Sequence, residues 1–312
     1  MRIVLLGATG FVGEHLLPEL SRRGHDCVVL ARSPNRCRDL RLIPGVEIRQ
    51  SLSLSPDKLA PLLEGVDAAI NLVGILNERG FGGRGFYRAH VKTVQNLLDA
   101  CQAAGVRRVV QISALNAGKG ESHYLASKGE AEALLRSSKF VDATILQPSV
   151  IFGDGDSFFN RFAALLRLMP VFFLACPSSR LQPVWVGDVV TAVGEVLDRQ
   201  GTAGKTLELA GPRVYTLKQL VQWTARAIGR KRWVIGLPNL LSRMQAMVMD
   251  FVPGKPFSTD NYKSLQLDNI SKNNALPNLG ISPRSINAVV PGYLCGSSHQ
   301  HRLDRWREDS SA

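Results

Sequence analysis

The chain has 312 residues, of which 45% are hydrophobic and 21% charged, a composition that excludes wholesale disorder, collagen and coiled coil. The net charge of +12 is spread over both halves of the sequence, so it suits a phosphorylated cofactor, an anionic membrane surface or an acidic protein. The sequence contains no basic motif interleaved with aromatic residues, and we therefore expect no nucleic-acid partner.

Cysteine usage and hydropathy indicate a reducing compartment. Five cysteines at wide spacings, without a CxxC pair, favour reduced thiols over a disulfide framework or a zinc site. No apolar run reaches the ~20 residues of a membrane-spanning helix, and the first ten residues lead directly into a glycine motif instead of a cleavage site. We expect a cytoplasmic protein without a bound metal, with peripheral attachment to the inner face of the membrane as an alternative.

Short apolar runs alternate with amphipathic segments along the first half of the chain. The predicted strands cover 2–7, 27–31, 67–74, 107–113 and 142–149, and the predicted helices cover 11–24, 55–65, 86–105 and 122–137. This alternation implies right-handed crossovers and a parallel sheet that is covered on both faces. The expected fold class is therefore α/β, a doubly wound parallel sheet (Rossmann) with a smaller C-terminal substrate lobe.

After about residue 150 the pattern becomes less regular. It predicts helices over 157–168 and 216–229, and a strand, a helix and a further strand within 183–211. We divide the chain into an NAD(P)-binding domain at 1–155, a mixed lobe at 156–295 and a mobile tail at 296–312, with part of 183–211 returning to the sheet.

Two segments of the lobe, 168–176 and 240–253, are unusually apolar. One interpretation is packing within the lobe. The other is a lid over a prenylated or quinone-like substrate, or a surface that lies on an anionic membrane, because methionine side chains adapt to such surfaces and the basic excess adds attraction.

The sharpest motif is GATGFVG, in which Gly7, Gly10 and Gly13 lie three residues apart between a predicted strand and a predicted helix. Gly7 permits the tight turn, Gly10 lets the backbone approach a pyrophosphate, and Gly13 lets the helix pack on the sheet. The N-terminus of the helix then holds the anion with its N–H groups and its dipole. An ordinary strand-to-helix turn is the alternative, but the position of the motif favours dinucleotide binding.

The residue after the second predicted strand bears on the choice of cofactor. The strand ends at Ala31, where an acidic residue would hold the ribose of NAD. Arg32 follows, and a guanidinium there suits the 2′-phosphate of NADP through charge-assisted hydrogen bonds; Arg36 and Arg38 lie close behind. We expect NADP(H) as the preferred cofactor, with NAD(H) as the alternative if these arginines form only a solvated loop.

Tyr124 and Lys128 stand four residues apart in a predicted helix and therefore share one of its faces. A lysine so placed lowers the pKa of the phenol and holds the nicotinamide ribose, and the phenol exchanges a proton with a carbonyl or an alcohol. The pair is common by chance on surface helices, but this helix follows the strand that ends at Ser113.

Together these motifs resemble the short-chain dehydrogenase/reductase superfamily, in its extended and atypical branches (NAD-dependent epimerase/dehydratase-like). The similarity covers roughly residues 1–200 and rests on GATGFVG, NLVG, HVKTVQNLLDACQAAGVRRVV, YLASK and QPSVIFGDGD. ARSPNR, VQISALNAG, YLASKGEAEALL and LQPVWVGDVVTAV are most similar to the branch that contains the nucleotide-binding accessory subunit of respiratory complex I and its bacterial relatives. Some members of that branch hold NADPH structurally, and others are linked to ubiquinone biosynthesis.

The resemblance implies roles for individual residues. Tyr124 is expected to be the acid/base, Lys128 its modulator and ribose anchor, and Ser113 an orienting hydroxyl. The expected cofactor contacts are Gly7, Thr9, Gly10, Phe11, Val12, Gly13, Arg32, Leu72, Val73, Gly74, Tyr124, Lys128, Pro148 and Ile151. In the same context, Asp154 and Asp156 are expected to form a turn that caps a helix rather than a metal loop.

The chain departs from the family pattern at two positions. A plain alignment places Ala114 in the slot of the reactive hydroxyl, and His90 stands where the family has an asparagine. A lost donor to a substrate carbonyl costs about 100-fold in rate. Three functions therefore stay open. The first is an NADP(H)-dependent oxidoreductase or epimerase that acts on a hydrophobic carbonyl or alcohol. The second is a non-catalytic accessory or assembly protein that holds NADPH and is linked to respiratory-chain proteins or ubiquinone biosynthesis, and the third is a redox-sensing module. The oligomeric state stays open as well.

Overall fold

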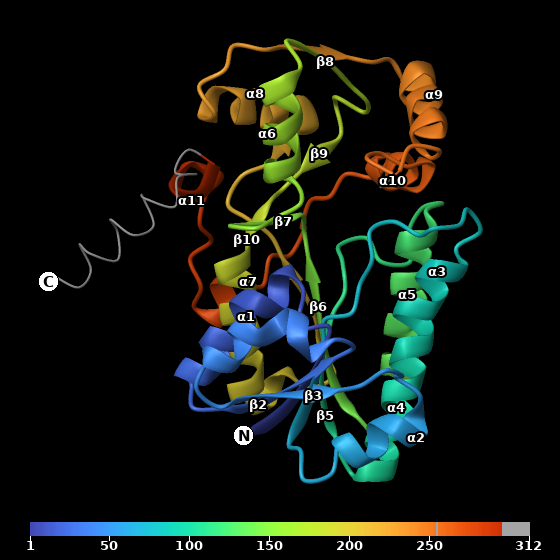
Figure 1. The fold of residues 1–312 in the computed structure, drawn as a ribbon, viewed down its shortest axis with the longest axis vertical. Helices are drawn as coiled ribbons and strands as arrows, with labels where there is room; N and C mark the ends of the chain where they lie inside the picture. The colour runs from blue at the N-terminus through green and yellow to red at the C-terminus, as the bar shows by residue number, and fades with distance from the viewer. Residues whose placement is uncertain (254, 295–312) are drawn as a thin grey trace, which may run out of the picture.

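The structure, a computed structural model, describes residues 1–253 and 255–294, without the side chains of residues 36, 38 and 200. The tail at 296–312 lies outside the described residues. Seven parallel strands form the main sheet, in the order β11-β6-β5-β4-β1-β2-β3 (Figure 1). They are β1 (Arg2–Leu6), β2 (Asp26–Ala31), β3 (Val46–Gln50), β4 (Ala68–Asn71), β5 (Arg108–Ile112), β6 (Asp142–Pro148) and β11 (Thr206–Leu209).

The strand order reverses between β1 and β4, which are paired neighbours. The carboxyl ends of these two strands therefore border the crevice in which an open α/β sheet binds its ligand. This topology confirms the predicted doubly wound Rossmann sheet. The second strand predicted within 183–211 is β11, which pairs with β6 at one edge of the sheet. The division of the chain at residue 155 stays a prediction.

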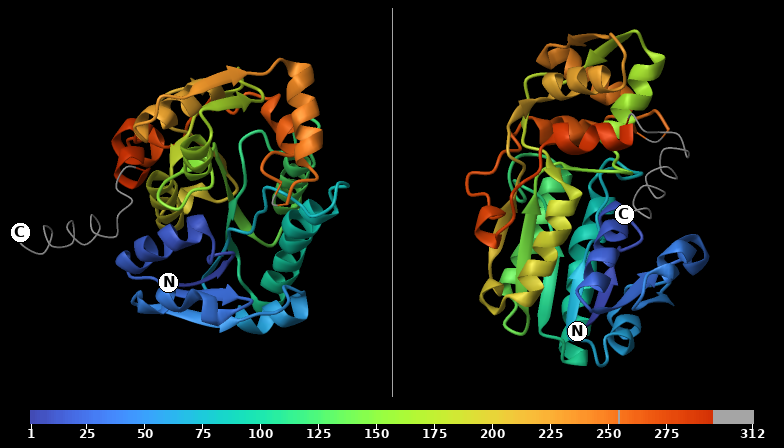
Figure 2. Two further views of the ribbon diagram at one scale, coloured as in Figure 1. Left: turned by 45° about the horizontal axis from the view of Figure 1, so that its top comes forward. Right: turned by 90° about the vertical axis from the view of Figure 1, so that its left-hand side faces the viewer.

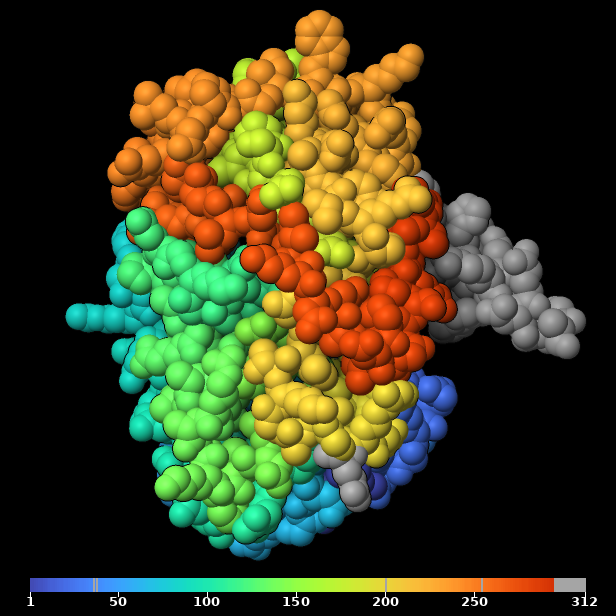
Figure 3. All heavy atoms as spheres, turned by 180° about the vertical axis from the view of Figure 1, so that it is seen from behind, coloured from blue at the N-terminus to red at the C-terminus, as the bar shows by residue number. Residues whose placement is uncertain are grey.

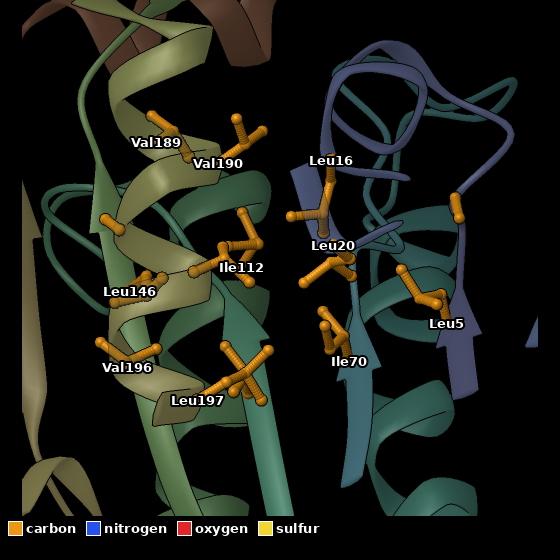
Figure 4. Close-up of a cluster of buried hydrophobic side chains, with 14 of the residues drawn as sticks. Leu5, Leu16, Leu20, Ile70, Ile112, Leu146, Val189, Val190, Val196 and Leu197 are labelled. Atoms are coloured by element: carbon orange, nitrogen blue, oxygen red, sulfur yellow. The ribbon is translucent and has the colours of Figure 1, made fainter. Parts of the chain in front are cut away.

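Helices cover both faces of the sheet (Figure 2). They are α1 (Phe11–Arg22) and α7 (Val186–Asp198) on one face, and α2 (Pro56–Leu59), α4 (Thr93–Ala104) and α5 (His123–Ser137) on the other. Successive strand residues point to opposite faces, so Leu5 belongs to the core that also contains Leu16 and Val190 (Figure 4), whereas Val4 belongs to the core on the side of α4 and α5. The buried side chains of both cores are mostly aliphatic.

A second group of elements caps the carboxyl edge of the sheet. Its helices are α6 (Phe159–Leu168), α8 (Leu217–Ala227), α9 (Asn239–Met249), α10 (Thr259–Leu265) and α11 (Ile286–Leu294). Its strands form three short pairs: β7 (Ile151–Phe152) with β10 (Val184–Trp185), β9 (Arg180–Leu181) with β12 (Tyr215–Thr216), and β8 (Val171–Leu174) with β13 (Trp233–Gly236). A third core, which includes Phe159, Leu220 and Val290, holds this group together.

Short helical turns join the larger elements. They are η1 (Pro34–Leu42), η2 (Ala60–Leu62), α3 (Arg84–Phe86), η3 (Tyr87–Lys92), η4 (Gln200–Thr202) and η5 (Pro277–Leu279). η3 is a π-helical turn that leads into α4, a feature that often marks functional sites. None of the helices in the described ranges has both the length and the apolar character needed to cross a membrane.

Candidate cofactor and active site

The loop from β1 to α1 requires glycine at two positions. Gly7 has a φ of +79°, and a Cβ there would lie 2.9 Å from the backbone nitrogen of Val73 at the end of β4. A Cβ on Gly13 would lie 2.2 Å from the Ala8 oxygen. The loop therefore lies so close to the end of β4 and to helix α1 that only glycine fits at these two positions.

The N-terminus of α1 is available for an anion. Its N-cap is Gly10, so no side chain caps the helix, and the first N–H groups and the helix dipole favour a negatively charged ligand. Thr9 is exposed beside this end, and Phe11 and Val12 are half-buried. Phe11 also meets the turn after β7, because a Cβ on Gly153 would lie 3.5 Å from its ring.

Arg32 lies directly after β2, whose last residue, Ala31, is buried. The Arg32 side chain is exposed, and its backbone oxygen accepts a hydrogen bond from Gln50 Nε2 at 3.5 Å. The side chains of residues 36 and 38 lie outside the described part of the structure. Position 31 holds alanine instead of an acidic residue, so the end of β2 presents the Arg32 cation.

Asn71 fixes the end of β4 beside the glycine loop. Its Nδ2 donates to Gln111 Oε1 at 2.8 Å, and its Oδ1 accepts from the backbone N–H of Val73 at 3.1 Å. Leu72 and Val73 are half-buried, and Gly74 is exposed. Sequence reasoning placed these three residues at the cofactor but did not identify Asn71 as the group that holds them.

The side chain of Lys128 is buried beside the segment that follows β4. Its Nζ donates to the Ile112 oxygen at 3.1 Å, and a Cβ on Gly74 would lie 3.4 Å from this ammonium. Burial lowers the pKa of Lys128 to about 8, although the charge of Glu132 works in the opposite direction. The ammonium therefore lies where the ends of β4 and β5 meet helix α5.

Tyr124 lies one turn earlier on α5, and its ring packs edge-on against Phe86 and His90, with centroids 6.0 and 5.6 Å away. Burial and the charge of Asp260 raise its pKa to about 12, so the phenol is protonated at neutral pH. Asp260 comes from α10 and accepts the backbone N–H groups of His123 at 2.6 Å and of Tyr124 at 3.2 Å. Sequence reasoning did not identify this carboxylate at the start of α5. Its expectation that Lys128 lowers the pKa of Tyr124 is wrong, because burial and the charge of Asp260 raise that pKa.

His90 connects three parts of the site. Its Nε2 accepts from the backbone N–H of Ile75 at 3.2 Å, so its Nδ1 carries the proton and donates to Ser127 Oγ at 2.8 Å. Ser127 Oγ in turn donates to the backbone carbonyl oxygen of Tyr124 at 2.9 Å. Burial, with the charge of Lys128, lowers the pKa of His90 to about 3, so a neutral imidazole joins the loop after β4 to the helix that carries Tyr124.

Ser113 directly follows β5 and is buried. Within the described part of the chain its Oγ has no hydrogen-bond partner. A buried hydroxyl without a partner costs about 1–3 kcal/mol, so its position points to a group that binds beside it. Ala114, the next residue, is also buried and contributes only a methyl group.

The segment after β6 completes the crevice. Pro148 is buried and Ile151 is half-buried, and Ser149 between them donates to Asn269 Oδ1 at 2.5 Å. Asp156 accepts from the backbone N–H groups of Gly153 at 3.1 Å and Asn160 at 3.2 Å. It therefore closes a turn before α6, although the N-cap position of that helix is Phe158 and not Asp154 or Asp156. In the described ranges, no group of three His, Cys, Asp or Glu side chains is arranged to hold a metal ion.

The predicted residues therefore come together at the carboxyl ends of β1, β4, β5 and β6, with Arg32 at the end of β2. A free helix N-terminus, a glycine cradle and the partnerless Ser113 hydroxyl fit a dinucleotide, with its pyrophosphate at α1 and its nicotinamide toward α5. A small cleft beside the N-terminus of α5, lined by residues such as Phe81, Phe86, His123 and Asp260, lies between this site and the C-terminal elements.

Comparison with known families agrees with this geometry. Residues 7–158 match the family described as NAD(P)H-binding. These residues fold as the Rossmann sheet described above and are similar to that family. The match agrees with the expectation of a dinucleotide-binding domain and does not decide between NAD and NADP.

Two curated relatives extend the similarity beyond this domain. Subunit 9 of the mitochondrial NADH dehydrogenase [ubiquinone] 1 alpha subcomplex from Rattus norvegicus is 28% identical, with 97% of this chain and 81% of the relative covered. A ceramide reductase from Caulobacter vibrioides is also 28% identical, with 76% of this chain and 74% of the relative covered. The resemblance to the complex I branch is confirmed by the first of these.

Among solved structures, a dTDP-glucose 4,6-dehydratase from Streptomyces venezuelae with NAD bound superposes with a TM-score of 0.74. It is 18% identical, with 94% of this chain and 96% of that chain covered. At this identity the likeness concerns the fold, which is of the epimerase/dehydratase type.

Proposed function

We propose that the chain is an NADP(H)-dependent reductase of a hydrophobic carbonyl compound of the quinone or lipid class. The observation that carries this proposal is a protonated Tyr124 phenol one helical turn from the buried Lys128, whose ammonium donates to the Ile112 oxygen directly before Ser113, a hydroxyl without a hydrogen-bond partner in the described part of the chain. A protonated phenol is the form that gives a proton to a carbonyl oxygen, so the site suits reduction better than oxidation.

Three side chains, Tyr124, Ser113 and Lys128, have separate roles in the proposed reaction. When bound, the reduced nicotinamide supplies a hydride to the substrate carbonyl carbon. Tyr124 Oη gives its proton to the carbonyl oxygen, and Ser113 Oγ donates a hydrogen bond to the same oxygen as negative charge develops on it. The Lys128 ammonium stabilises the phenolate that Tyr124 becomes and holds the ribose hydroxyls.

The cofactor preference rests on Arg32. The uncapped N-terminus of α1 would hold the pyrophosphate, and the exposed guanidinium after β2 would pair with the 2′-phosphate of NADP. NAD lacks that phosphate, and position 31 holds no carboxylate for its ribose hydroxyl. We also place the protein in the cytoplasm, because the four described cysteines are free thiols.

The substrate class is inferred from the C-terminal elements and from one relative. Apolar side chains predominate in the segments 168–176 and 240–253, and the relative named ceramide reductase reduces a lipid by its name. A lipid-like or quinone-like carbonyl matches both observations.

The test is NADPH oxidation in the presence of a panel of water-soluble ubiquinone analogues and long-chain ketolipids. Tyr124→Phe should lose at least about 100-fold in kcat while its affinity for NADPH stays unchanged. Tyr87→Phe, a matched change at an exposed tyrosine of η3, should keep full turnover. Unchanged turnover in Tyr124→Phe would overturn the catalytic assignment.

A second candidate is an accessory protein of the respiratory chain that holds NADPH without turning it over. It is favoured by the buried Ala114 in the slot of the reactive hydroxyl and by the relative that is a subunit of mitochondrial NADH dehydrogenase. This function requires NADPH to exchange very slowly and Tyr124→Phe to have no effect. Rapid exchange of NADPH in a stopped-flow chase would exclude it.

A further inference from the structure

Strand β8 and helix α9 lie at the end of the molecule farthest from the N-terminus (Figure 1). The β8–β13 pair and α9 expose apolar side chains there. Strands β8 and β13 pair in parallel, with Phe173 beside Ile235 in register. The outward side chains Phe173, Trp233 and Ile235 are 50%, 75% and 42% exposed, whereas the alternate residues Leu174 and Val234 are buried in the third core. The pair therefore has one buried face and one apolar face toward solvent.

Helix α9 continues this apolar surface. Its Ser242 and Ala246 are fully buried, whereas Leu240, Met244 and Val248, one turn apart, are 71%, 50% and 63% exposed. The buried side is fastened to the strands, since the backbone N–H of Cys176 donates to Ser242 Oγ at 3.1 Å. α9 is thus amphipathic with its apolar stripe outward, the reverse of an ordinary surface helix.

The six side chains Phe173, Trp233, Ile235, Leu240, Met244 and Val248 are called the end face below. They belong to the elements coloured yellow-green and orange at the top of Figure 3. One interpretation of the apolar segments 168–176 and 240–253 was packing within the lobe. That packing accounts for the buried Leu174 and Ala175, but it does not account for the exposed side chains of the end face. Exposed apolar side chains gathered at one end of a molecule mark a site that binds something else.

The charge around the end face identifies the partner. The two stretches that build this end, 157–187 and 209–249, contain no Asp or Glu. Arg230 and Lys231 are exposed directly before Trp233, and Arg243 is exposed on α9 between the apolar residues. Apolar side chains flanked by these cations match an anionic bilayer, which offers acyl chains below a layer of negative headgroups. Trp233 has the amphipathic ring that is enriched at this interface.

We propose that the end face binds the surface of an anionic lipid bilayer, with its apolar side chains inserted at the boundary between headgroups and acyl chains. The proposal does not depend on the cofactor or on catalysis. The proposal also places the membrane next to helices α9 and α10. Helix α10 reaches the active site, because its Asp260 accepts hydrogen bonds from the first residues of α5.

Vesicle flotation tests the proposal on the full chain. Vesicles of phosphatidylcholine mixed with an equal part of phosphatidylglycerol should carry the protein at low salt, whereas pure phosphatidylcholine vesicles or high salt should release most of it. The emission of Trp233 should shift to shorter wavelength on binding. Trp233→Phe should remove that shift while the protein still floats.

Two matched variants separate the end face from general surface effects. Leu240→Glu should weaken vesicle binding at least about tenfold, and Leu52→Glu, at a leucine that is 78% exposed in the nucleotide-binding half, should bind like the wild type. Recovery of the wild type in the soluble fraction at low salt would overturn the proposal, as would equal losses in the two variants. A salt-independent dimer in sedimentation velocity that Leu240→Glu dissociates would assign the end face to a second copy of the chain instead.

Discussion

Replacing Lys128 by methionine is expected to stabilise the folded protein at neutral pH while removing its reductase activity. The side chain is 4% exposed, and burial lowers the pKa of its ammonium from 10.5 to about 8. A pKa difference of this size corresponds to about 3 kcal/mol against the charged form. The variant loses the hydrogen bond to the Ile112 oxygen, about 1 kcal/mol, although Gln111 Nε2 still donates to that oxygen at 2.8 Å. The expected net gain is therefore about 2 kcal/mol.

The gain should depend on pH with a definite sign. Because the pKa is lower in the folded chain than in the unfolded chain, the cost of burying the ammonium is fully present below pH 8 and disappears as the pH rises toward 10.5. The difference between variant and wild type should shrink across that range.

Urea unfolding, followed by tryptophan fluorescence at neutral pH and at about pH 10, measures this difference. Lys139→Met, at an exposed lysine just beyond α5, serves as the control and should change the free energy of unfolding little at either pH. A Lys128→Met variant that is less stable than the wild type at neutral pH would refute the reasoning. So would a gain in stability that does not change with pH.

Two further substitutions examine the geometry of the site. Gly7→Ala should lower the free energy of unfolding by more than about 2 kcal/mol, since it adds a collision with β4 to the cost of a left-handed residue. Gly24 also has a positive φ, +77°, but has open space around it, so Gly24→Ala should lower the free energy of unfolding by only about 1 kcal/mol in the same urea titration. Equal losses in the two variants would exclude crowding at β4. Asp260→Asn should lower the pKa of Tyr124 from about 12, because it removes a negative charge and keeps an acceptor for the helix N–H groups. An ultraviolet titration, with Tyr124→Phe subtracted, measures that pKa, and an unchanged value would show that burial alone sets it.

Periodicity predicted most of the sheet because its central strands are short apolar runs covered on both faces. Strand β3 was missed, since VEIRQ alternates polar residues along a half-exposed edge and offers no such run. The helix predicted at 55–65 divides into α2 and η2, because Pro61 has no N–H to continue the hydrogen bonds.

The candidate site was predictable where it is local in sequence. The glycine loop lies within a few residues, and Tyr124 and Lys128 are one helical turn apart. Asp260 was not predictable, because the fold brings it to α5 from 136 residues away. His90 appeared only as a departure from a family pattern, since its hydrogen bonds depend on three separate elements. The apolar segments 168–176 and 240–253 were recognised from the sequence, but Trp233 and Ile235 of the end face were not. Periodicity defines an apolar stripe but does not say whether it faces the core or solvent.

The central claim is that the glycine loop and Arg32 hold NADP(H). Its most direct measurement is a titration with NADPH and with NADH, read by energy transfer from the tryptophans to the bound nicotinamide. NADPH should bind more tightly than NADH, and Arg32→Ala should weaken NADPH by about 10- to 100-fold and leave NADH nearly unchanged. Arg22→Ala, at the far end of α1, should affect neither. Binding of neither nucleotide, or equal losses for both in Arg32→Ala, would contradict the claim.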